Sequence, residues 1–345
     1  MFVVIVKIQI KPEFREPFLV AMVDNTRSSE EKEAKRILGI PAHMKIAYAC
    51  RLGYPISELG KRLRVRRGVK DFTHHNRFGS RGLHKKNLRI RRCTMNMKGN
   101  TVLITGGATG IGFSLAEHFV KASNDVIVCG RRQEKLREAK SRLPQIHTRE
   151  CDVSKDKERG MLSDWVASNF KDINILVNNA GIQRMIDFRK GTHELFGGED
   201  EIKTNLKAYV HMSAYFIPNF LKRKESAIIN VSSGLAFVPL AVAPVYCATK
   251  AAVHSFSVSL RHQLRGTSIK VFEIIPPTVD TELDKGARER RGQQYRGIPP
   301  SEVAIAAMKG LENDEYEVAV GQAQGLRMAA ASGNADQLFQ NMNRW

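Results

Sequence analysis

A phenol, an ammonium group and a hydroxyl lie close together in the second half of this 345-residue chain. Tyr246 and Lys250 are four residues apart, so on a helix they share one face and the lysine charge can approach the phenolic oxygen. A nearby cation favours a phenolate and so makes a phenol a better acid. Ser233 lies thirteen residues before Tyr246, where its hydroxyl could hold a substrate oxygen. The three residues predict proton transfer to or from a carbonyl or alcohol oxygen.

A glycine-rich turn suggests the cofactor for this chemistry. The segment Thr105-Gly-Gly-Ala-Thr-Gly-Ile-Gly112 follows an apolar run and precedes a helical pattern. In such a strand–turn–helix unit, Gly106 allows the tight turn, Gly110 lets the backbone approach a pyrophosphate and Gly112 lets the helix pack closely. A purely structural turn is the alternative. The candidate phosphate-binding residues are Gly106, Thr109, Gly110, Ile111 and Gly112.

Two further motifs complete a family pattern. Asn178-Asn-Ala-Gly181 follows a buried-strand run, and Asn205 lies on the next helical stretch. With the glycine turn, Ser233, Tyr246 and Lys250, they resemble the short-chain dehydrogenase/reductase family over residues 98–321. The resemblance implies a Rossmann domain that binds a nicotinamide cofactor. It places Asn179, Ala180 and Gly181 along the cofactor wall.

The resemblance also implies the catalytic roles. Tyr246 would act as general acid in reduction and as general base in oxidation. Lys250 would lower the pKa of Tyr246 and bind the nicotinamide ribose, while Asn205 would hold a water that links Lys250 to solvent. Ser233 would hold the substrate oxygen, with Ser232 as the competing hydroxyl. The predicted function is an oxidoreductase that interconverts a carbonyl and a secondary alcohol, with the catalytic residues Asn205, Ser233, Tyr246 and Lys250.

Alternating strand-like and helical segments predict the fold that must position these groups. Strand-like runs fall near 101–105, 125–129, 146–150, 173–177, 227–231, 269–275 and 316–320. Helical stretches fall near 110–122, 132–143, 155–170, 200–222, 244–265 and 301–313. This alternation predicts an α/β fold with a Rossmann-type, doubly wound, parallel seven-stranded sheet. Ligand is then expected beyond the carboxyl ends of the strands.

Two arginines after the second strand-like run indicate which cofactor to expect. An NAD site usually places Asp or Glu about 20 residues beyond the glycines, but this chain has Arg131 and Arg132. Guanidinium groups can bind a ribose phosphate bidentately. We therefore predict NADP(H) in preference to NAD(H), with Arg131 as a contact; a solvated helix start is the alternative. The resemblance adds Asp152 and Val153 at the adenine, although Asp152 could equally cap the following helix.

A proline pair follows the sixth strand-like run, in Pro276-Pro-Thr-Val-Asp-Thr281. Pro277 replaces a glycine that is usual in the family, so no amide proton is available there. The Val279 backbone N–H remains as a donor to the cofactor carboxamide, and Pro276 and Thr281 complete the expected cofactor contacts. The polar segment 282–297 is interpreted as a substrate lid or, alternatively, as a surface loop.

The first 94 residues differ from the rest of the chain in residue pattern and charge. Residues 1–35 resemble the opening strand and helix of the antibiotic-biosynthesis monooxygenase family, with the helix expected from Pro12 to Arg27. Residues 36–94 are a basic linker that we expect to be disordered, since 36–98 hold seventeen Lys or Arg and two acidic residues. One strand and one helix cannot bury a core. We interpret this region as an upstream fragment fused to a reductase.

The expected reductase domain is therefore 95–321, starting at Met95 or Met97, and 322–345 form a C-terminal helical tail. The tail could cover an oligomer surface or cap the domain. The resemblance implies a small-molecule carbonyl or alcohol as substrate and a homodimer or homotetramer as assembly. No metal site is expected, because the histidines and cysteines show no recurring ligand spacing.

Composition narrows the setting and leaves two other functions to test. Five cysteines without a paired framework favour a reducing cytoplasm. Neither an 18-residue apolar run nor a signal peptide is found, so we expect no membrane insertion. A cofactor-binding regulator without turnover is one alternative, against which the complete catalytic set argues. The other is nucleic-acid binding by the basic 36–94 segment, which lacks a zinc pattern and an aromatic RNA-binding signature.

Overall fold

The computed structural model of this chain describes residues 5–8, 18–21, 48–50, 94–284 and 297–343. It contains two compact units, Met1–Arg91 and Arg92–Trp345. The described part of the first unit consists of three short antiparallel strands, β1 (Ile5–Ile8), β2 (Phe18–Ala21) and β3 (Tyr48–Cys50), in the order β1-β2-β3.

Strand β2 corrects one sequence expectation. Phe18–Ala21 lie within the stretch that we expected to be helical, but they pair with β1 from Ile8↔Phe18 to Ile5↔Ala21. A short apolar run fits a strand as well as a helix, and pairing with a neighbouring strand then satisfies its backbone groups. Similarly, Tyr48–Cys50 form β3 inside the linker expected to be disordered. The remainder of that linker up to residue 93 lies outside the described residues.

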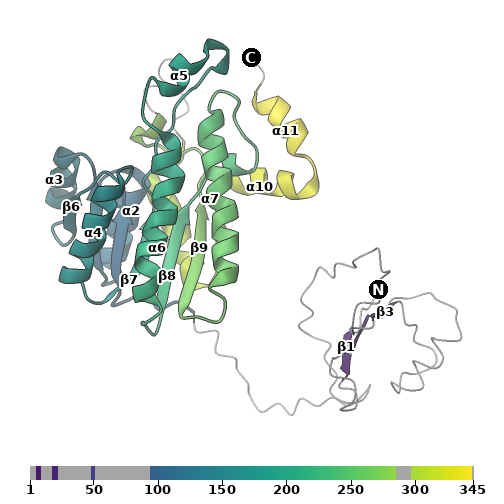
Figure 1. Ribbon diagram of the computed structural model, residues 1–345, viewed down its shortest axis with the longest axis horizontal. Helices are drawn as coiled ribbons and strands as arrows, with labels where there is room; N and C mark the ends of the chain where they lie inside the picture. The colour runs from purple at the N-terminus through teal and green to yellow at the C-terminus, as the bar shows by residue number, and fades with distance from the viewer. Residues whose placement is uncertain (1–4, 9–17, 22–47, 51–93, 285–296, 344–345) are drawn as a thin grey trace, which may run out of the picture. The chain divides into compact units, whose positions relative to one another are not determined.

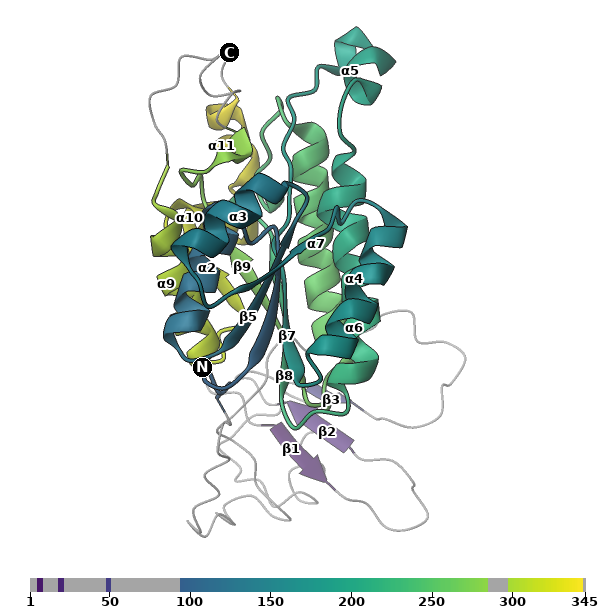
Figure 2. The same ribbon diagram turned by 90° about the vertical axis from the view of Figure 1, so that its left-hand side faces the viewer.

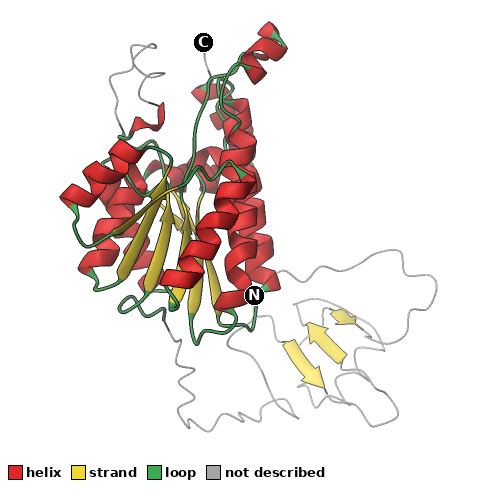
Figure 3. Cartoon of the chain, turned by 60° about the vertical axis from the view of Figure 1, so that its left-hand side comes forward, coloured by secondary structure: helices red, strands yellow, loops and turns green. Residues whose placement is uncertain are grey.

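The second unit is built on a seven-stranded parallel sheet, as the strand–helix alternation predicted (Figure 3). The strand order is β10-β9-β8-β7-β4-β5-β6, so the winding reverses between β4 and β7. Ligands bind at such a reversal, beyond the carboxyl ends of the strands. The strands are β4 (Thr101–Thr105), β5 (Asp125–Gly130), β6 (His147–Glu150), β7 (Ile173–Asn178), β8 (Ser226–Val231), β9 (Ile269–Ile275) and β10 (Glu317–Ala319).

Helices cover both faces of this sheet (Figures 1 and 2). One face is covered by α2 (Gly110–Lys121), α3 (Gln133–Arg142) and α9 (Pro300–Glu312). The other is covered by α4 (Asp156–Asn169), α6 (Ala208–Phe220) and α7 (Pro244–Gln263). The remaining elements are η1 (Phe188–Lys190), α5 (Thr192–Phe196), η2 (Lys203–Lys207), η3 (Gly234–Ala236), η4 (Glu282–Asp284), α10 (Gln322–Ser332) and α11 (Ala335–Met342).

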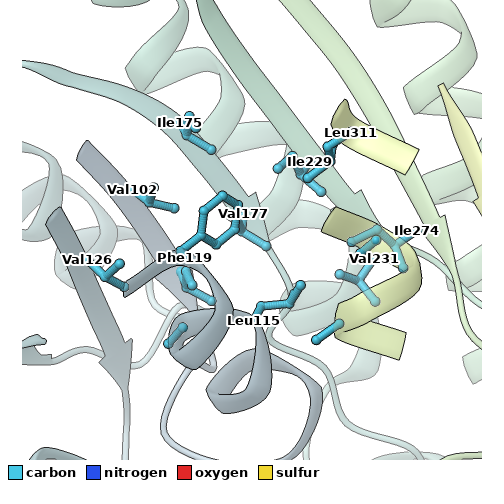
Figure 4. Close-up of a cluster of buried hydrophobic side chains, with 14 of the residues drawn as sticks. Val102, Leu115, Phe119, Val126, Ile175, Val177, Ile229, Val231, Ile274 and Leu311 are labelled. Carbon is cyan, nitrogen blue, oxygen red and sulfur yellow. The ribbon is translucent and has the colours of Figure 1, made fainter. Parts of the chain in front are cut away.

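The central strands are rich in apolar residues because both of their faces are buried. In β4, Val102, Leu103 and Ile104 have no exposed surface. Figure 4 shows Leu115 and Phe119 of α2 among the side chains of the sheet. Burying a side chain of this size stabilises the fold by about 1.5–3 kcal/mol. Met95 and Met97, just before β4, are buried in the same core.

Two regions have more detail than the sequence predicted. The stretch expected as one helix over 200–222 contains a π-helical turn, η2, before α6 begins at Ala208. Such turns often occur at functional sites. The C-terminal tail forms two helices, α10 and α11.

Candidate active site

A cavity of about 1540 Å³ opens at the carboxyl ends of β4, β7, β8 and β9. Of the sequence-predicted site residues, those that line it are Gly106, Thr109, Gly110, Ile111, Arg131, Asp152, Val153, Asn179, Ala180, Gly181, Ser233, Tyr246, Lys250, Pro276, Val279 and Thr281. Gly112 and Asn205 do not line it and lie behind its wall, in contact with lining residues. Its volume exceeds that of an ordinary small-molecule pocket, about 300–1,000 Å³, so it has room for a dinucleotide and a substrate.

The glycine turn and the Asn178–Gly181 loop are bonded to each other. Thr105 at the end of β4 accepts hydrogen bonds at its Oγ1 from the backbone N–H groups of Asn179 (3.0 Å) and Ala180 (3.1 Å). Gly106 has a φ of +62°, and a Cβ there would lie 2.8 Å from the Cα of Ala180. Only glycine fits both the conformation and the space. The turn therefore keeps an open backbone surface facing the cavity.

Helix α7 brings the phenol and the ammonium group to the cavity wall, as their spacing predicted. Lys250 donates a hydrogen bond from Nζ to the Val231 carbonyl at 2.8 Å, and Nζ lies 5.7 Å from the centre of the Tyr246 ring. Lys250 is only 3% exposed. Burial lowers its pKa to about 7, although the negative charge of Glu273 opposes this. The lysine therefore titrates near neutral pH instead of remaining charged throughout.

Asn205, in the π-helical turn η2, is bonded to the loop that follows β7. Its Nδ2 donates to the Ile182 carbonyl at 2.8 Å, and its Oδ1 accepts from the Ile182 N–H at 2.9 Å. A Cβ at Gly181 would lie 3.5 Å from Asn205 Oδ1 and 3.7 Å from Lys250 Nζ. Asn205 and Lys250 therefore approach the same small space beside Gly181.

The two adjacent serines have different surroundings. Ser233 precedes η3 and its Oγ accepts a hydrogen bond from the Leu235 N–H at 3.1 Å, which leaves its hydroxyl proton to donate. The Ser232 hydroxyl donates instead to Glu273 Oε1 at 2.5 Å. This arrangement favours Ser233, as the spacing predicted, over the competing Ser232.

Glu273 is a residue that the sequence reasoning missed. It lies in β9 with no exposed surface, and His254 of α7 binds its Oε2 through Nδ1 at 2.8 Å. That hydrogen bond is the main reason why the pKa of His254 is raised. A signal was present in the sequence, because Glu273 is the one charged residue in the apolar run Val271-Phe-Glu-Ile-Ile275. A carboxylate in a buried strand needs partners.

Tyr209 of α6 is a second missed residue. Its hydroxyl donates to the Val231 carbonyl at 3.2 Å, so this carbonyl accepts from both Tyr209 and Lys250. Burial raises the pKa of Tyr209 well above its usual value, which keeps the phenol protonated and able to donate. Tyr209 thus helps to fix the acceptor that holds Lys250.

The two predicted phosphate-binding arginines line the cavity and pair with carboxylates. Arg131 binds both oxygens of Glu199, with Nη2 and Oε2 3.0 Å apart, and Arg132 binds Glu282 at 2.8 Å. Helix α3 begins after Arg132, at Gln133. Both guanidinium groups are nearly half exposed, so a phosphate can compete for them.

Asp152 lies at the cavity, before the start of helix α4. Helix α4 begins at Asp156 with Lys155 in the capping position, so Asp152 does not cap it. Asp152 instead accepts from the Ser154 N–H at 3.0 Å and lines the cavity. Thr281 lies beside Gly110, where a Cβ would be 2.9 Å from the Thr281 methyl carbon. Most of the predicted lid, residues 285–296, lies outside the described residues.

Comparison with known proteins agrees with this geometry. The family model for short chain dehydrogenases matches residues 100–292. The chain belongs to the short-chain dehydrogenase family. An uncharacterized oxidoreductase, DltE, from Bacillus subtilis (strain 168) is 51% identical over 249 residues, which are 72% of this chain and 98% of the relative. As a family member, the chain is an NAD(P)-dependent oxidoreductase.

Two other family members are informative. The NADP-dependent 3-hydroxy acid dehydrogenase YdfG from Salmonella typhi is 36% identical over 218 residues, which are 59% of this chain and 86% of the relative. A short chain dehydrogenase from Burkholderia cenocepacia J2315, solved in complex with NADP, has a TM-score of 0.60 and 25% identity. That match covers 73% of this chain and 100% of the solved chain.

Two observations concern membrane spans and metal sites. Within residues 94–284 and 297–343 and the three N-terminal strands, no helix combines the length and apolar character needed to cross a membrane. In the same described ranges, no three His, Cys, Asp or Glu side chains are grouped so that they could hold a metal ion.

Proposed function

We propose that this short-chain dehydrogenase reduces a carbonyl to a secondary alcohol with NADPH, and that Tyr246 is the general acid. The observation that carries the proposal is the position of Lys250. Its ammonium group is anchored on the Val231 carbonyl beneath the Tyr246 ring, at the wall of a cavity that Ser233 also lines. A phenol, a cation and a hydroxyl at one wall are what protonation of a carbonyl oxygen requires.

The residues present fit a dinucleotide. Gly106 packs closely against Ala180 and has no side chain, so the backbone at the amino end of α2 is open to the cavity. There the N–H groups and the helix dipole favour phosphate. The Asn179 loop, with Ala180 and Gly181, would hold the nicotinamide half, and Asp152 and Val153 the adenine. Pro276, Val279 and Thr281 would hold the carboxamide side.

The preference for NADPH rests on Arg131 and Arg132. Both line the cavity, where a 2′-phosphate could replace the carboxylates that they now bind. Lys135 is also in the lining, so three cations surround this part of the cavity. The NADP dependence named for the Salmonella relative is consistent with this proposal.

Each protein group has a separate task in the reaction. Bound NADPH supplies the hydride. Ser233 donates a hydrogen bond to the substrate oxygen, and Tyr246 gives it a proton. The Lys250 cation stabilises the phenolate that remains. Asn205 holds a water that links Lys250 to solvent, and a proton returns to Tyr246 by this path. In the opposite direction Tyr246 acts as base on the alcohol, the kind of substrate named for the Salmonella relative.

The test measures NADPH consumption with a panel of ketones and aldehydes, together with cofactor binding. Tyr246→Phe should retain NADPH binding and lose turnover by roughly 10²–10⁴-fold, the usual contribution of a general acid. Tyr316→Phe is the matched control, because Tyr316 stacks on Phe272 away from the cavity lining. Cofactor binding without turnover by the native protein would instead support the regulatory alternative.

We also propose that the protein acts in the cytoplasm as a homodimer or homotetramer. Cys129, Cys151 and Cys247 are free thiols, which fits a reducing compartment. Large apolar side chains are exposed on α4 and just beyond α6, including Met161 at 52% and Leu221 at 49%. Sedimentation would show a single monomeric species if the oligomer proposal is wrong.

A further inference from the structure

The C-terminal helix α10 is packed directly on the loop that carries Ser233. A Cβ at Gly234 would lie 2.7 Å from Leu326 Cδ1 and 3.1 Å from Ala323 Cβ. Ala323 is fully buried. Because these contacts leave no space at Gly234, α10 is part of the site next to Ser233 and is not a loose extension. Figure 1 shows α10 and α11 in yellow.

Helix α11 is attached to the same region by the side chain of Asn343. Its Oδ1 accepts from the Ala241 N–H at 2.7 Å, and its Nδ2 donates to the Pro239 carbonyl at 3.2 Å. Both partners lie in the segment that leads into α7 and Tyr246. The amide thus fixes the end of α11 beside the catalytic residues.

These attachments create a continuous apolar wall. Leu235 and Leu240 pack against the buried cluster of Ala243, Tyr246 and Cys247, so the wall begins at the catalytic ring. It continues across the cavity through side chains from the loop 235–242, from α10 and from α11. The cavity lining on this side includes Leu235, Leu240, Val242, Leu326, Leu338 and Met342, all partly buried.

The guanidinium group of Arg184 is already engaged within the protein. Arg184 lines the cavity, but its guanidinium donates to the carbonyls of Leu195 (3.0 Å), Glu199 (3.2 Å) and Glu194 (2.6 Å). Arg184 therefore caps the carboxyl-terminal end of the short helix α5. Within the described residues, the lining that 235–242, α10 and α11 contribute is mainly aliphatic and thioether, and its polar members are the uncharged amides Gln322 and Asn343. Such a surface binds hydrocarbon and not charge.

We propose that the substrate carries an apolar chain of several carbons next to its carbonyl, and that the wall formed by residues 235–242, α10 and α11 binds this chain. The inference rests on the proposed carbonyl reduction and names the class of its substrate. The carbonyl lies at Ser233 and Tyr246, and the chain extends from the Tyr246 ring toward Leu338 and Met342.

The experiment uses a series of methyl ketones with alkyl chains of increasing length. Turnover is measured with NADPH, and binding is measured by calorimetry with and without NADP⁺. In the native protein each added methylene should raise affinity and kcat/KM about two- to fourfold until the wall is filled. Met342→Gln should reduce this increase per methylene, so that its loss grows with chain length. Met342→Leu should keep it.

Met328→Gln is the matched control. Met328 is 69% exposed on α10 and outside the cavity lining, so the same substitution there should leave the whole series unchanged. Turnover of all ketones with equal kcat/KM would overturn the inference while the proposed reaction stands. Binding that strengthens with chain length without any turnover would contradict the reaction and keep the apolar site. A Met328→Gln effect equal to that of Met342→Gln would also overturn the inference.

Discussion

Ser232 donates a hydrogen bond to Glu273, a carboxylate with no exposed surface on strand β9. His254 binds the other oxygen of that carboxylate. On α7, Lys250 and His254 are four residues apart, and the negative charge of Glu273 favours the charged form of Lys250. A buried carboxylate that does not line the cavity therefore supports the residues that we propose for catalysis.

This support leads to a prediction about pH. Burial lowers the pKa of Lys250 to about 7, and the negative charge of Glu273 keeps it from falling further. In Glu273→Gln the pKa of Lys250 should fall, so Lys250 loses its ammonium form at a lower pH. The decrease of the reduction rate with rising pH should therefore begin at a lower pH. At pH 7.5 we expect kcat to be lower by roughly three- to tenfold. Glu317→Gln, at the register partner on β10, should leave the profile unchanged. An unchanged profile in Glu273→Gln would refute this role.

The His254–Glu273 pair should make stability depend on pH. The pKa of His254 is raised in the folded state by its hydrogen bond to Glu273. The pair therefore stabilises the folded protein fully at pH values below the pKa of this histidine in the unfolded chain. This stabilisation is lost as the pH rises through the pKa of His254 in the folded protein. His254→Gln should cost roughly 1–2 kcal/mol at pH 6 and less at pH 9. Denaturant unfolding at both pH values measures the difference.

His147→Gln provides the comparison for that measurement. His147 lies 3.0 Å from Asp125, but both side chains are nearly half exposed, where ion pairs contribute little. Equal losses at both pH values in His254→Gln would mean that packing against Phe237, not charge, is what the histidine provides.

Arg131 should determine cofactor preference. Arg131→Asp removes a cation and adds a negative charge where a 2′-phosphate is expected, so NADPH binding should weaken roughly tenfold or more and NADH binding should not. Glu199→Gln should act oppositely and tighten NADPH, since it removes the carboxylate that now occupies Arg131. Fluorescence titration of both cofactors measures these changes. Arg137→Asp, on the helix α3 that follows, is outside the cavity lining and serves as the control.

Gly181 offers a test of the proposed proton route. An alanine methyl there would lie at ordinary contact distance from Asn205 Oδ1 (3.5 Å) and Lys250 Nζ (3.7 Å), so the fold should accept it. The methyl group would fill the space in which a water could join the two. Gly181→Ala should then lower kcat by roughly tenfold or more with little change in melting temperature. Gly160→Ala in α4, where a Cβ has similarly ordinary contacts, should be fully active. Full activity in Gly181→Ala would exclude a route through this space.

The sequence predicted most of this fold because its signals are local. A buried parallel strand such as Thr101–Thr105 has a continuous apolar centre, and it is followed by a glycine turn and a helical pattern. The elements with weak local signals were the ones that differed. Phe18–Ala21 are too short to distinguish strand from helix, and the π-helical turn around Asn205 has the same residue pattern as an ordinary helix.

Residues that act only through tertiary contacts could not be placed in the same way. Lys250 was identified by its spacing from Tyr246, but its acceptor on β8 and the Tyr209 hydroxyl that shares this acceptor come from other elements. Glu273 and His254 are nineteen residues apart, and nothing local connects them. The paired state of Arg131 also depends on Glu199, from a distant loop. Such contacts become visible only when the sheet order is known.

The attachment of α11 through Asn343 has a practical consequence for protein engineering. The bonds from this amide to Pro239 and Ala241 hold the helix through main-chain groups, so they do not depend on the other side chains of α11. A combinatorial library limited to Leu338 and Met342 would vary the apolar lining of the cavity and leave Tyr246, Lys250 and the glycine turn unaltered. Selection of such a library could retarget this scaffold to new ketones without rebuilding its catalytic residues.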